Sequence, residues 1–243
     1  MMGMRRIQEQ QARWILAASV VVTALLYVVP GGRILAYPLV LLSTFVHEMA
    51  HGLTAIVVGG TFVDLQVFGD ASGVAVTATD GGALDRAAVA AGGLIGPALA
   101  AAIGFTMARR PQTSRIALII GSLLVAIGTV LWVRSLIGWL VALGLIGTSL
   151  GIALGLRQAQ WSQLWLVLLS VQLGLSVFSR SEYLFAEGAT TGAGRGLSDS
   201  AAIAAALFGP YWLWGALCGL VSVAVLAYGL LLFVYPPSGR QHA

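Results

Sequence analysis

Two histidines and a glutamate of this chain have a spacing suited to metal chemistry. His47 and His51 are four residues apart, and Glu48 directly follows the first of them. In an α-helix this spacing places both imidazoles on one face, about one turn apart, so both can bind one Zn²⁺ ion. Glu48 is rotated off that face but stays beside the open coordination position, where a carboxylate can accept a proton from a metal-bound water. The HExxH pattern therefore predicts a zinc site with His47 and His51 as ligands and Glu48 as the catalytic base.

The surroundings of the motif argue against a chance match. The chain has only 3 His, and two of them belong to the motif. The motif lies within residues 35–58, an apolar segment with the length of a membrane span. A carboxylate at membrane depth is costly unless it is paired or solvated, so a Glu between two His at that depth indicates a functional site.

The composition indicates that most of the chain lies in a lipid bilayer. Hydrophobic residues make up 58% of it and charged residues 9%, with a mean hydropathy of +0.92. A water-soluble fold could not cover its surface with so few charges, and the single Cys excludes a disulfide scaffold. The 13 basic residues are all Arg and are scattered between apolar runs, which is typical of topology signals, so we expect no nucleic-acid partner.

The apolar residues gather in segments that have or approach the roughly 20 residues of a membrane-spanning helix. Seven such segments cover residues 14–29, 35–58, 87–108, 116–133, 136–156, 161–178 and 211–235. We therefore expect an all-α polytopic membrane protein with about seven transmembrane helices, folded as a single membrane-embedded domain over residues 1–243. An integral multi-pass protein of a bacterial inner membrane fits this pattern, and the sequence leaves the oligomeric state open.

Two connections between the apolar segments have patterns of their own. Residues 62–79 contain two runs of alternating or β-branched residues around a Gly/Asp turn, which predicts a small β-hairpin after the zinc-binding helix. Its edge would suit an unwound substrate strand, or the hairpin is only a structural loop. Residues 179–198 are polar and Gly-rich, which predicts an irregular loop, and residues 198–208 predict a short helix with Ser198 as its N-cap.

Small residues recur every four positions in two of the apolar segments. One ridge consists of Gly92, Gly96, Ala100 and Gly104, and the other of Gly147, Gly151 and Gly155. Such ridges let membrane helices approach closely, so we interpret both as packing faces in preference to a substrate-contacting face.

A catalytic zinc usually has three protein ligands, and the motif supplies two. The acids outside it that could complete the site are Asp64, Asp70, Asp80, Asp85, Glu182, Glu187 and Asp199, whereas His242 lies in the polar tail. At 1.5 Å per residue, His47 and His51 lie about 18 and 24 Å along their segment from Leu35, near the hairpin side. Four further spans return the chain to that side at Asp199. We therefore predict Asp199 as the third ligand, the alternative being a helix N-terminal acid favoured by the helix dipole.

The stretch from His47 to Gly52, HEMAHG, resembles the site-2 protease family of intramembrane zinc metalloproteases, in its short bacterial and plant branch without a PDZ domain. Supporting similarities lie in Gly59-Gly60 with Ser72-Gly73-Val74, in the Gly-rich residues 91–97, and in Ser198-Asp199 followed by Gly209-Pro210 and Trp212 or Trp214. The resemblance covers roughly residues 35–226. It implies zinc ligation by His47, His51 and Asp199, with Glu48 as general base. It also implies hydrolysis of peptide bonds in or near transmembrane segments of membrane-anchored proteins.

Some features depart from that family. The Asn-Pro-Asp-Gly type motif around the third ligand is absent, and the chain contains no Asn, so an Asn that stabilises the oxyanion cannot exist. Arg180, Tyr183 and Arg195 are candidates for that role, and the sequence selects none of them. Two other interpretations stay open: a pseudoprotease that keeps the motif for structure or metal sensing, and a transporter that uses it as a metal or proton path.

Overall fold

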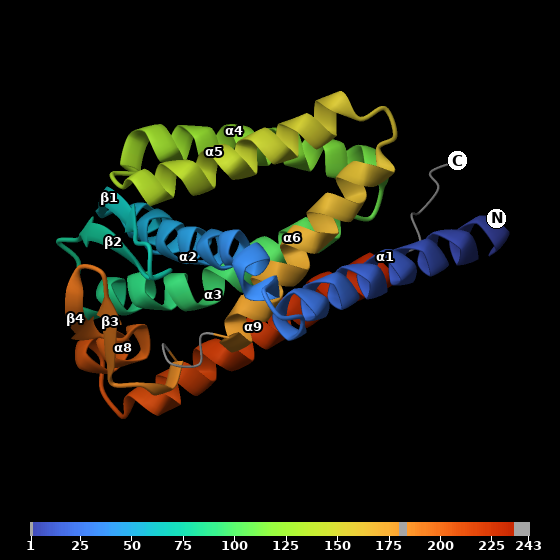
Figure 1. Cartoon of the computed structure of the whole chain (residues 1–243). Coiled ribbons are helices and arrows are strands. Elements are labelled where there is room, and N and C mark those ends of the chain that lie inside the picture. The colour runs from blue at the N-terminus through green and yellow to red at the C-terminus, as the bar shows by residue number, and fades with distance from the viewer. Residues whose placement is uncertain (1, 180–183, 236–243) are drawn as a thin grey trace.

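The computed structural model describes residues 2–179 and 184–235 (Figure 1). The described chain is mainly helical, with two short antiparallel sheets gathered at one end. The helices are α1 (Met2–Val28), α2 (Gly32–Val57), α3 (Ala83–Met107), α4 (Pro111–Trp132), α5 (Leu136–Leu150) with the π-helical turn η1 (Gly151–Gly155), α6 (Gln160–Ser179), α8 (Asp199–Ala206) and α9 (Tyr211–Val234). The strands are β1 (Thr61–Val67), β2 (Gly73–Ala78), β3 (Gly188–Thr191) and β4 (Gly194–Leu197).

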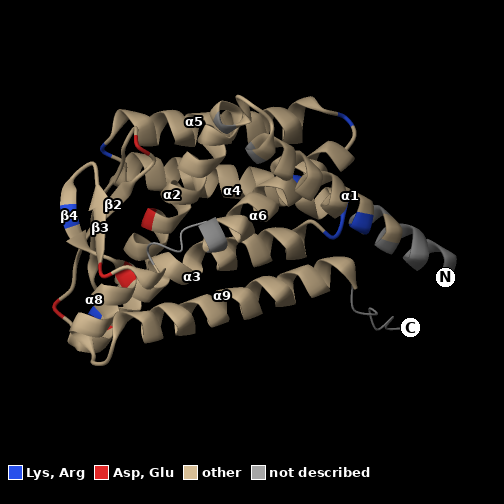
Figure 2. Ribbon diagram, turned by 60° about the horizontal axis from the view of Figure 1, so that its bottom comes forward, with Lys and Arg blue, Asp and Glu red and all other residues tan. Residues whose placement is uncertain are grey.

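Five helices in the described part of the chain are long and apolar enough to cross a membrane, which identifies a multi-pass membrane protein. They are Ile34–Val57, Ala83–Met107, Pro111–Trp132, Leu136–Gly155 and Tyr211–Val234. Figure 2 shows that the long helices carry few charged residues along their length. The expected count of seven spans is not confirmed, because α1 and α6 fall outside these five.

The two long helices that are not among the five candidate spans, α1 and α6, differ from each other. In α1 the described apolar stretch is Arg13–Leu26, which is shorter than the five candidate spans. Figure 1 also shows that α1 and α2 both run toward the hairpin end, so they follow each other instead of crossing as an antiparallel pair. In α6, Gln163 and Gln172 are buried inside the bundle along with several serines, so this helix hides polar side chains from the surroundings.

The core of the bundle forms where α6 crosses the other helices. Val167 of α6 is fully buried and belongs to one cluster with Phe105 of α3 and Phe233 of α9. The Gln163 side-chain amide donates to the Ala108 carbonyl at 2.7 Å, at the end of α3. Because α6 is central and hydrogen-bonded to the end of α3, it fixes the surface on which α3 packs. The position of α3 matters because this helix contacts the HExxH motif of α2.

The small-residue ridge of α3 is a packing face, as expected. A Cβ atom at Gly92 would overlap the Thr54 side chain of α2, and one at Gly96 would overlap the Ala50 side chain, so the backbone of α3 lies directly against side chains of α2. The ridge of Gly147, Gly151 and Gly155 is different. No heavy atom of the described residues lies within 4 Å of a Cβ built at any of the three, so the packing prediction is wrong for that ridge.

The first hairpin, β1–β2, packs on the C-terminal half of α2. Leu65 and Val67 of β1 are buried against Phe45 of α2, which explains the alternating pattern in the sequence. The strands are antiparallel, with Leu65 opposite Ala75 and a register shift between Phe62 and Asp64.

The turn of this hairpin is tied to α2 by two hydroxyl groups. The Tyr37 hydroxyl donates to the Gly69 carbonyl and the Thr44 hydroxyl to the Ala71 carbonyl, the latter at 2.6 Å. Ala71 has a φ of 65°, an uncommon conformation for a residue with a side chain, and the Thr44 bond helps to hold it. The hairpin is thereby fixed beside the motif of α2.

A second hairpin, β3–β4, replaces the irregular loop expected between residues 179 and 198. Its strands pair with Thr190 opposite Arg195, although their Gly, Ala and Thr residues have no alternating apolar pattern. Its tip is held by the first hairpin, since the Gly192 backbone N–H donates to Ser72 Oγ at 2.9 Å and Gly192 lies against the Phe68 ring. Tertiary contact stabilises these strands, which is why local sequence did not reveal them.

Candidate metal centre

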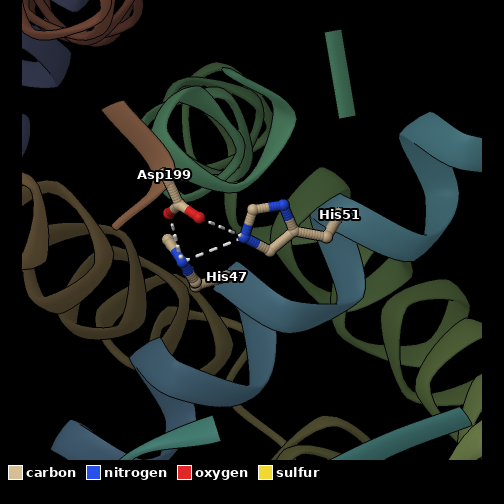
Figure 3. A group of neighbouring side chains, drawn as sticks. All are labelled: His47, His51 and Asp199. Atoms are coloured by element: carbon tan, nitrogen blue, oxygen red, sulfur yellow. Dashed lines mark hydrogen bonds and ion pairs between the residues drawn. The ribbon is translucent and has the colours of Figure 1, made fainter. Parts of the chain in front are cut away.

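Three side chains from two distant segments meet below the hairpins (Figure 3). His47 Nε2 lies 3.0 Å from Asp199 Oδ2, and His51 Nε2 lies 3.3 Å from Asp199 Oδ1. The two histidine Nε2 atoms are 3.2 Å apart. In the described residues this is the one group of three or more His, Cys, Asp or Glu side chains with the spacing of a metal site.

The two histidines are placed by the uninterrupted helix α2. Their i and i+4 spacing brings the rings edge to face, with centroids 4.7 Å apart, on the side of α2 that faces α8. Both residues are buried, so bulk water does not compete strongly for their nitrogen atoms.

Asp199 is placed by the N-terminus of α8. Ser198 caps this helix, because its Oγ accepts from the Ala201 backbone N–H at 3.2 Å, as the sequence predicted. The same hydroxyl donates to the Ala186 carbonyl, which ties the helix start to the preceding chain. Ile203 anchors the other side of α8 in a core shared with α3 and α9. The carboxylate of Asp199 is therefore held toward α2 by the cap and by packing.

The hydrogen bonding of the group favours a cation at its centre. His51 Nδ1 lies 2.8 Å from the Val89 carbonyl, which can only accept, so Nδ1 carries the proton and a neutral ring presents a lone pair at Nε2. That lone pair faces Asp199 Oδ1. Asp199 Oδ2 is buried and, although close to His47, accepts no hydrogen bond. A buried carboxylate oxygen without a donor is costly, and a metal ion bound by both nitrogens and the carboxylate would remove that cost.

Glu48 lies beside this group without joining it. Its side chain is buried, with 5% relative exposure, and lines the same cavity as the two histidines and Asp199. Glu48 is one position from His47 and three from His51 on α2, so a water molecule in the cavity can approach its carboxylate and the histidine nitrogens. The role of Glu48 as the catalytic base stays a prediction.

A cavity of about 750 Å³ opens above the three side chains. Its walls come from residues 73–75 and 77–80, in and after β2, and from residues 193–197, in and before β4. Because neighbouring strand residues point to opposite faces, a cavity lined by consecutive residues lies along the edge of a strand. The cavity is thus bordered by an edge of β2 and an edge of β4. Each of these strands has one partner, β1 and β3 respectively.

The other acids considered from the sequence do not join the group. Asp64 accepts from the Gln66 side-chain amide at 3.3 Å. Asp70 lies exposed in the hairpin turn, where hydrogen bonds from the Ser72 hydroxyl and backbone N–H hold the pKa of its carboxyl below the usual value. Three further acids lie apart from the histidines: Asp80 at the cavity wall, Asp85 in the first turn of α3, and the exposed Glu187.

Two side chains proposed for oxyanion stabilisation, Arg180 and Tyr183, lie outside the described residues, as does Glu182. The third, Arg195, is in β4 and lines the cavity.

Sequence reasoning missed the hydrogen bond between His51 Nδ1 and the Val89 carbonyl, because a backbone acceptor has no sequence signature. The nearby Gly92 and Gly93 were a signal, because glycines mark places where backbone approaches closely.

Comparison with known proteins gives one match. A sequence model of the family described as Peptidase M50B-like matches residues 17–229, which is most of the chain. A search of curated proteins and a search of solved structures found no significant match.

Proposed function

The chain belongs to the Peptidase M50B-like family, within the site-2 protease family that the motif resembles, and from this we propose that it is an intramembrane zinc metalloprotease. The observation that carries the proposal is the meeting of His47, His51 and Asp199, with a buried carboxylate oxygen that accepts no hydrogen bond. Its substrates would be membrane-anchored proteins cleaved in or near their transmembrane segments. Its location would be the bilayer of a bacterial inner membrane.

The residues present suit zinc. Two imidazole nitrogens and one carboxylate oxygen form a three-ligand set that leaves a coordination position open, as in catalytic zinc sites. When bound there, zinc supplies a Lewis acid that activates a water molecule and polarises the scissile carbonyl. The site holds one carboxylate in addition to Glu48, so the positive charge of the ion is balanced within the membrane.

Glu48 would act as the general base and then the general acid. In this role its carboxylate takes the proton of the attacking water and returns it to the amine of the leaving peptide. A buried carboxylate beside the cavity is well placed for this transfer, because it borders the space in which the attacking water and the leaving amine would lie. His47, His51 and Asp199 hold the metal and take no part in the proton transfer.

The substrate must be unwound before it is cut, because a helix hides its carbonyl groups in i to i−4 hydrogen bonds. The edges of β2 and β4 that border the cavity offer a place for the extended segment. A peptide strand lying there would pair with backbone groups and pass over the three side chains by β-augmentation. Arg195 of β4 would then lie along the bound strand.

The proposal is tested with Glu48→Gln, reconstituted in lipid vesicles with a single-span reporter protein. We expect cleavage to fall by at least 100-fold, because the base is lost, while zinc content measured by elemental analysis stays near one per chain. Glu187→Gln, an exposed acid in the same half of the molecule, serves as the control and should cleave normally. Cleavage that persists in Glu48→Gln, or a wild-type protein that binds no metal, contradicts the proposal.

A further inference from the structure

Two glycines from outside α2 lie directly against the side chains proposed for catalysis. We propose that they are positioning residues, Gly93 of α3 for the His51 ring and Gly73 of β2 for the Glu48 carboxylate. This inference rests on the proposed function and adds to it the elements that hold the two side chains in place. In both cases the absence of a Cβ atom is what leaves room for the catalytic group.

Gly93 leaves space for the metal-binding edge of His51. A Cβ atom at Gly93 would overlap Nε2 and Cε1 of the ring and would lie 2.7 Å from Cδ2. The ring cannot swing aside freely, because its Nδ1 is bonded to the Val89 carbonyl at 2.8 Å and its side chain is buried. Val89 and Gly93 are one turn apart on α3, so this helix contacts both nitrogen-bearing sides of the ring.

The other glycines of this face of α3 touch different groups. A Cβ atom at Gly92 would meet Thr54, and one at Gly96 would meet the Ala50 side chain. These contacts bring α2 and α3 together but involve no proposed ligand. Gly93 therefore differs from its neighbours in what it contacts, and Gly96 provides a matched control for general helix crowding.

Gly73 leaves space for Glu48. A Cβ atom there would lie 2.6 Å from Cγ and 2.9 Å from Oε1 of Glu48, and 2.7 Å from Cγ2 of Thr44. Real Cβ contacts are longer than this, so a side chain at this position would displace the carboxylate. Gly73 cannot move away easily, because the adjoining turn is held by the Thr44 hydroxyl on the Ala71 carbonyl.

Backbone conformation does not explain either glycine. The described glycines with positive φ are Gly31, Gly59, Gly194 and Gly209. Gly73 and Gly93 have backbone angles that any residue adopts, so the reason for glycine at these positions is space.

The first experiment compares Gly93→Ala with Gly96→Ala and Gly144→Ala, where Gly144 faces open space. Zinc affinity is measured by competition with a chromophoric chelator, and the geometry of the site by the visible spectrum of the cobalt-loaded protein. We expect Gly93→Ala to lose 10- to 100-fold in zinc affinity and to change the cobalt spectrum, as changes around a ligating His typically do. Gly96→Ala and Gly144→Ala should bind within threefold of wild type. Equal loss in Gly93→Ala and Gly96→Ala, or wild-type affinity in Gly93→Ala, overturns the role of Gly93.

A double-mutant cycle covers the case in which Gly93→Ala folds poorly. Gly93→Ala is made in the wild-type and in the His51→Ala backgrounds, and melting temperatures are measured with a chelator present. If the methyl group collides with the His51 ring, Gly93→Ala lowers the melting temperature in the wild-type background and much less in the His51→Ala background. Equal destabilisation in both backgrounds contradicts the inference. Because the cycle uses the metal-free protein, it detects the contact between position 93 and the His51 ring even if the proposed zinc function is wrong.

The second experiment separates Gly73 from the metal. Gly73→Ala should bind zinc within threefold of wild type, since Glu48 is not a ligand, but its kcat on the reporter should fall at least tenfold. Gly69→Ala lies in the same hairpin with open space around it and should cleave normally. Normal turnover in Gly73→Ala overturns its role while the protease function stands. A wild-type protein without zinc or cleavage refutes the function itself.

Discussion

At the scale of single residues, the candidate site depends on which atoms carry protons. The Val89 carbonyl assigns the Nδ1 proton of His51 and so turns Nε2 toward Asp199. The carboxylate in turn has an oxygen that accepts no hydrogen bond. A metal ion satisfies both groups at once, and Asp199 is the one acid in the described chain that lies close enough to both histidines to take part.

This assignment predicts the effect of removing the carboxylate. Asp199→Ala should lose stoichiometric zinc, with affinity reduced at least 100-fold, because two histidines alone make an incomplete site. Asp70→Ala, which removes an exposed acid of the hairpin turn, should keep one zinc per chain. Elemental analysis of the purified proteins measures both. Full zinc occupancy in Asp199→Ala would move the third ligand to another acid.

At the scale of elements, one long helix and one short helix together present the side chains of the candidate site. The two histidines and Glu48 come from a long helix, but Asp199 comes from the eight-residue helix α8, too short to be stable alone. Its stability depends on the Ser198 cap and on the core it shares with α3 and α9. The placement of Asp199 is therefore sensitive to a residue outside the group of three side chains.

Loss of the Ser198 cap should affect stability and zinc binding together. Ser198→Ala removes the acceptor for the Ala201 N–H and should lower the free energy of unfolding by about 1 kcal/mol. Because α8 starts at the ligand, zinc affinity should fall as well. Ser135→Ala removes the N-cap of α5, whose hydroxyl also accepts from the Val67 N–H of β1 but contacts none of the three side chains, and it should lower stability without changing zinc affinity. Thermal melts and chelator competition measure the two effects, and unchanged zinc affinity in Ser198→Ala would contradict this link.

At the scale of the whole molecule, the site forms where distant parts of the chain return to one end. Four long helices, α3 to α6, separate His51 from Asp199 in sequence, and an even number of passes brings the chain back to the hairpin end (Figure 1). The connection from α3 to α4 and that from α5 to α6 lie at the opposite end (Figure 1), where Gln112 and Gln158 line one hollow. The N-terminal end of α1 and the C-terminal end of α9 lie toward that opposite end too (Figure 1).

This arrangement predicts labelling from opposite membrane faces. Single cysteines are placed at Gly69 or Glu187, near the hairpins, and at Gln112 or Gln158, at the other end. The background is Cys218→Ser, because Cys218 is the only native cysteine. In sealed, oriented vesicles a membrane-impermeant maleimide should label one pair from outside and the other only after lysis. Labelling of all four from the same face would refute this topology.

The sequence alone determined the local features of this protein. The helical spacing of His47, Glu48 and His51, the membrane class and the N-cap at Ser198 all depend on residues within a few turns of one another. Local periodicity and composition report such features directly, because the physics involved is that of one helix and its solvent. The number of spans was less predictable, because a buried helix such as α6 can carry polar side chains that local composition does not distinguish from a connecting segment.

Only the tertiary structure decided which residues meet. Seven acids were open as the third ligand from sequence, and the fold brings Asp199 to the two histidines because α8 packs against α3 and α9. The β3–β4 hairpin, the Val89 carbonyl on His51 and the role of Gly93 likewise depend on contacts between separate elements. Such contacts are stabilised by packing across the whole bundle. Since no short window of sequence contains both partners, no local pattern could have specified them.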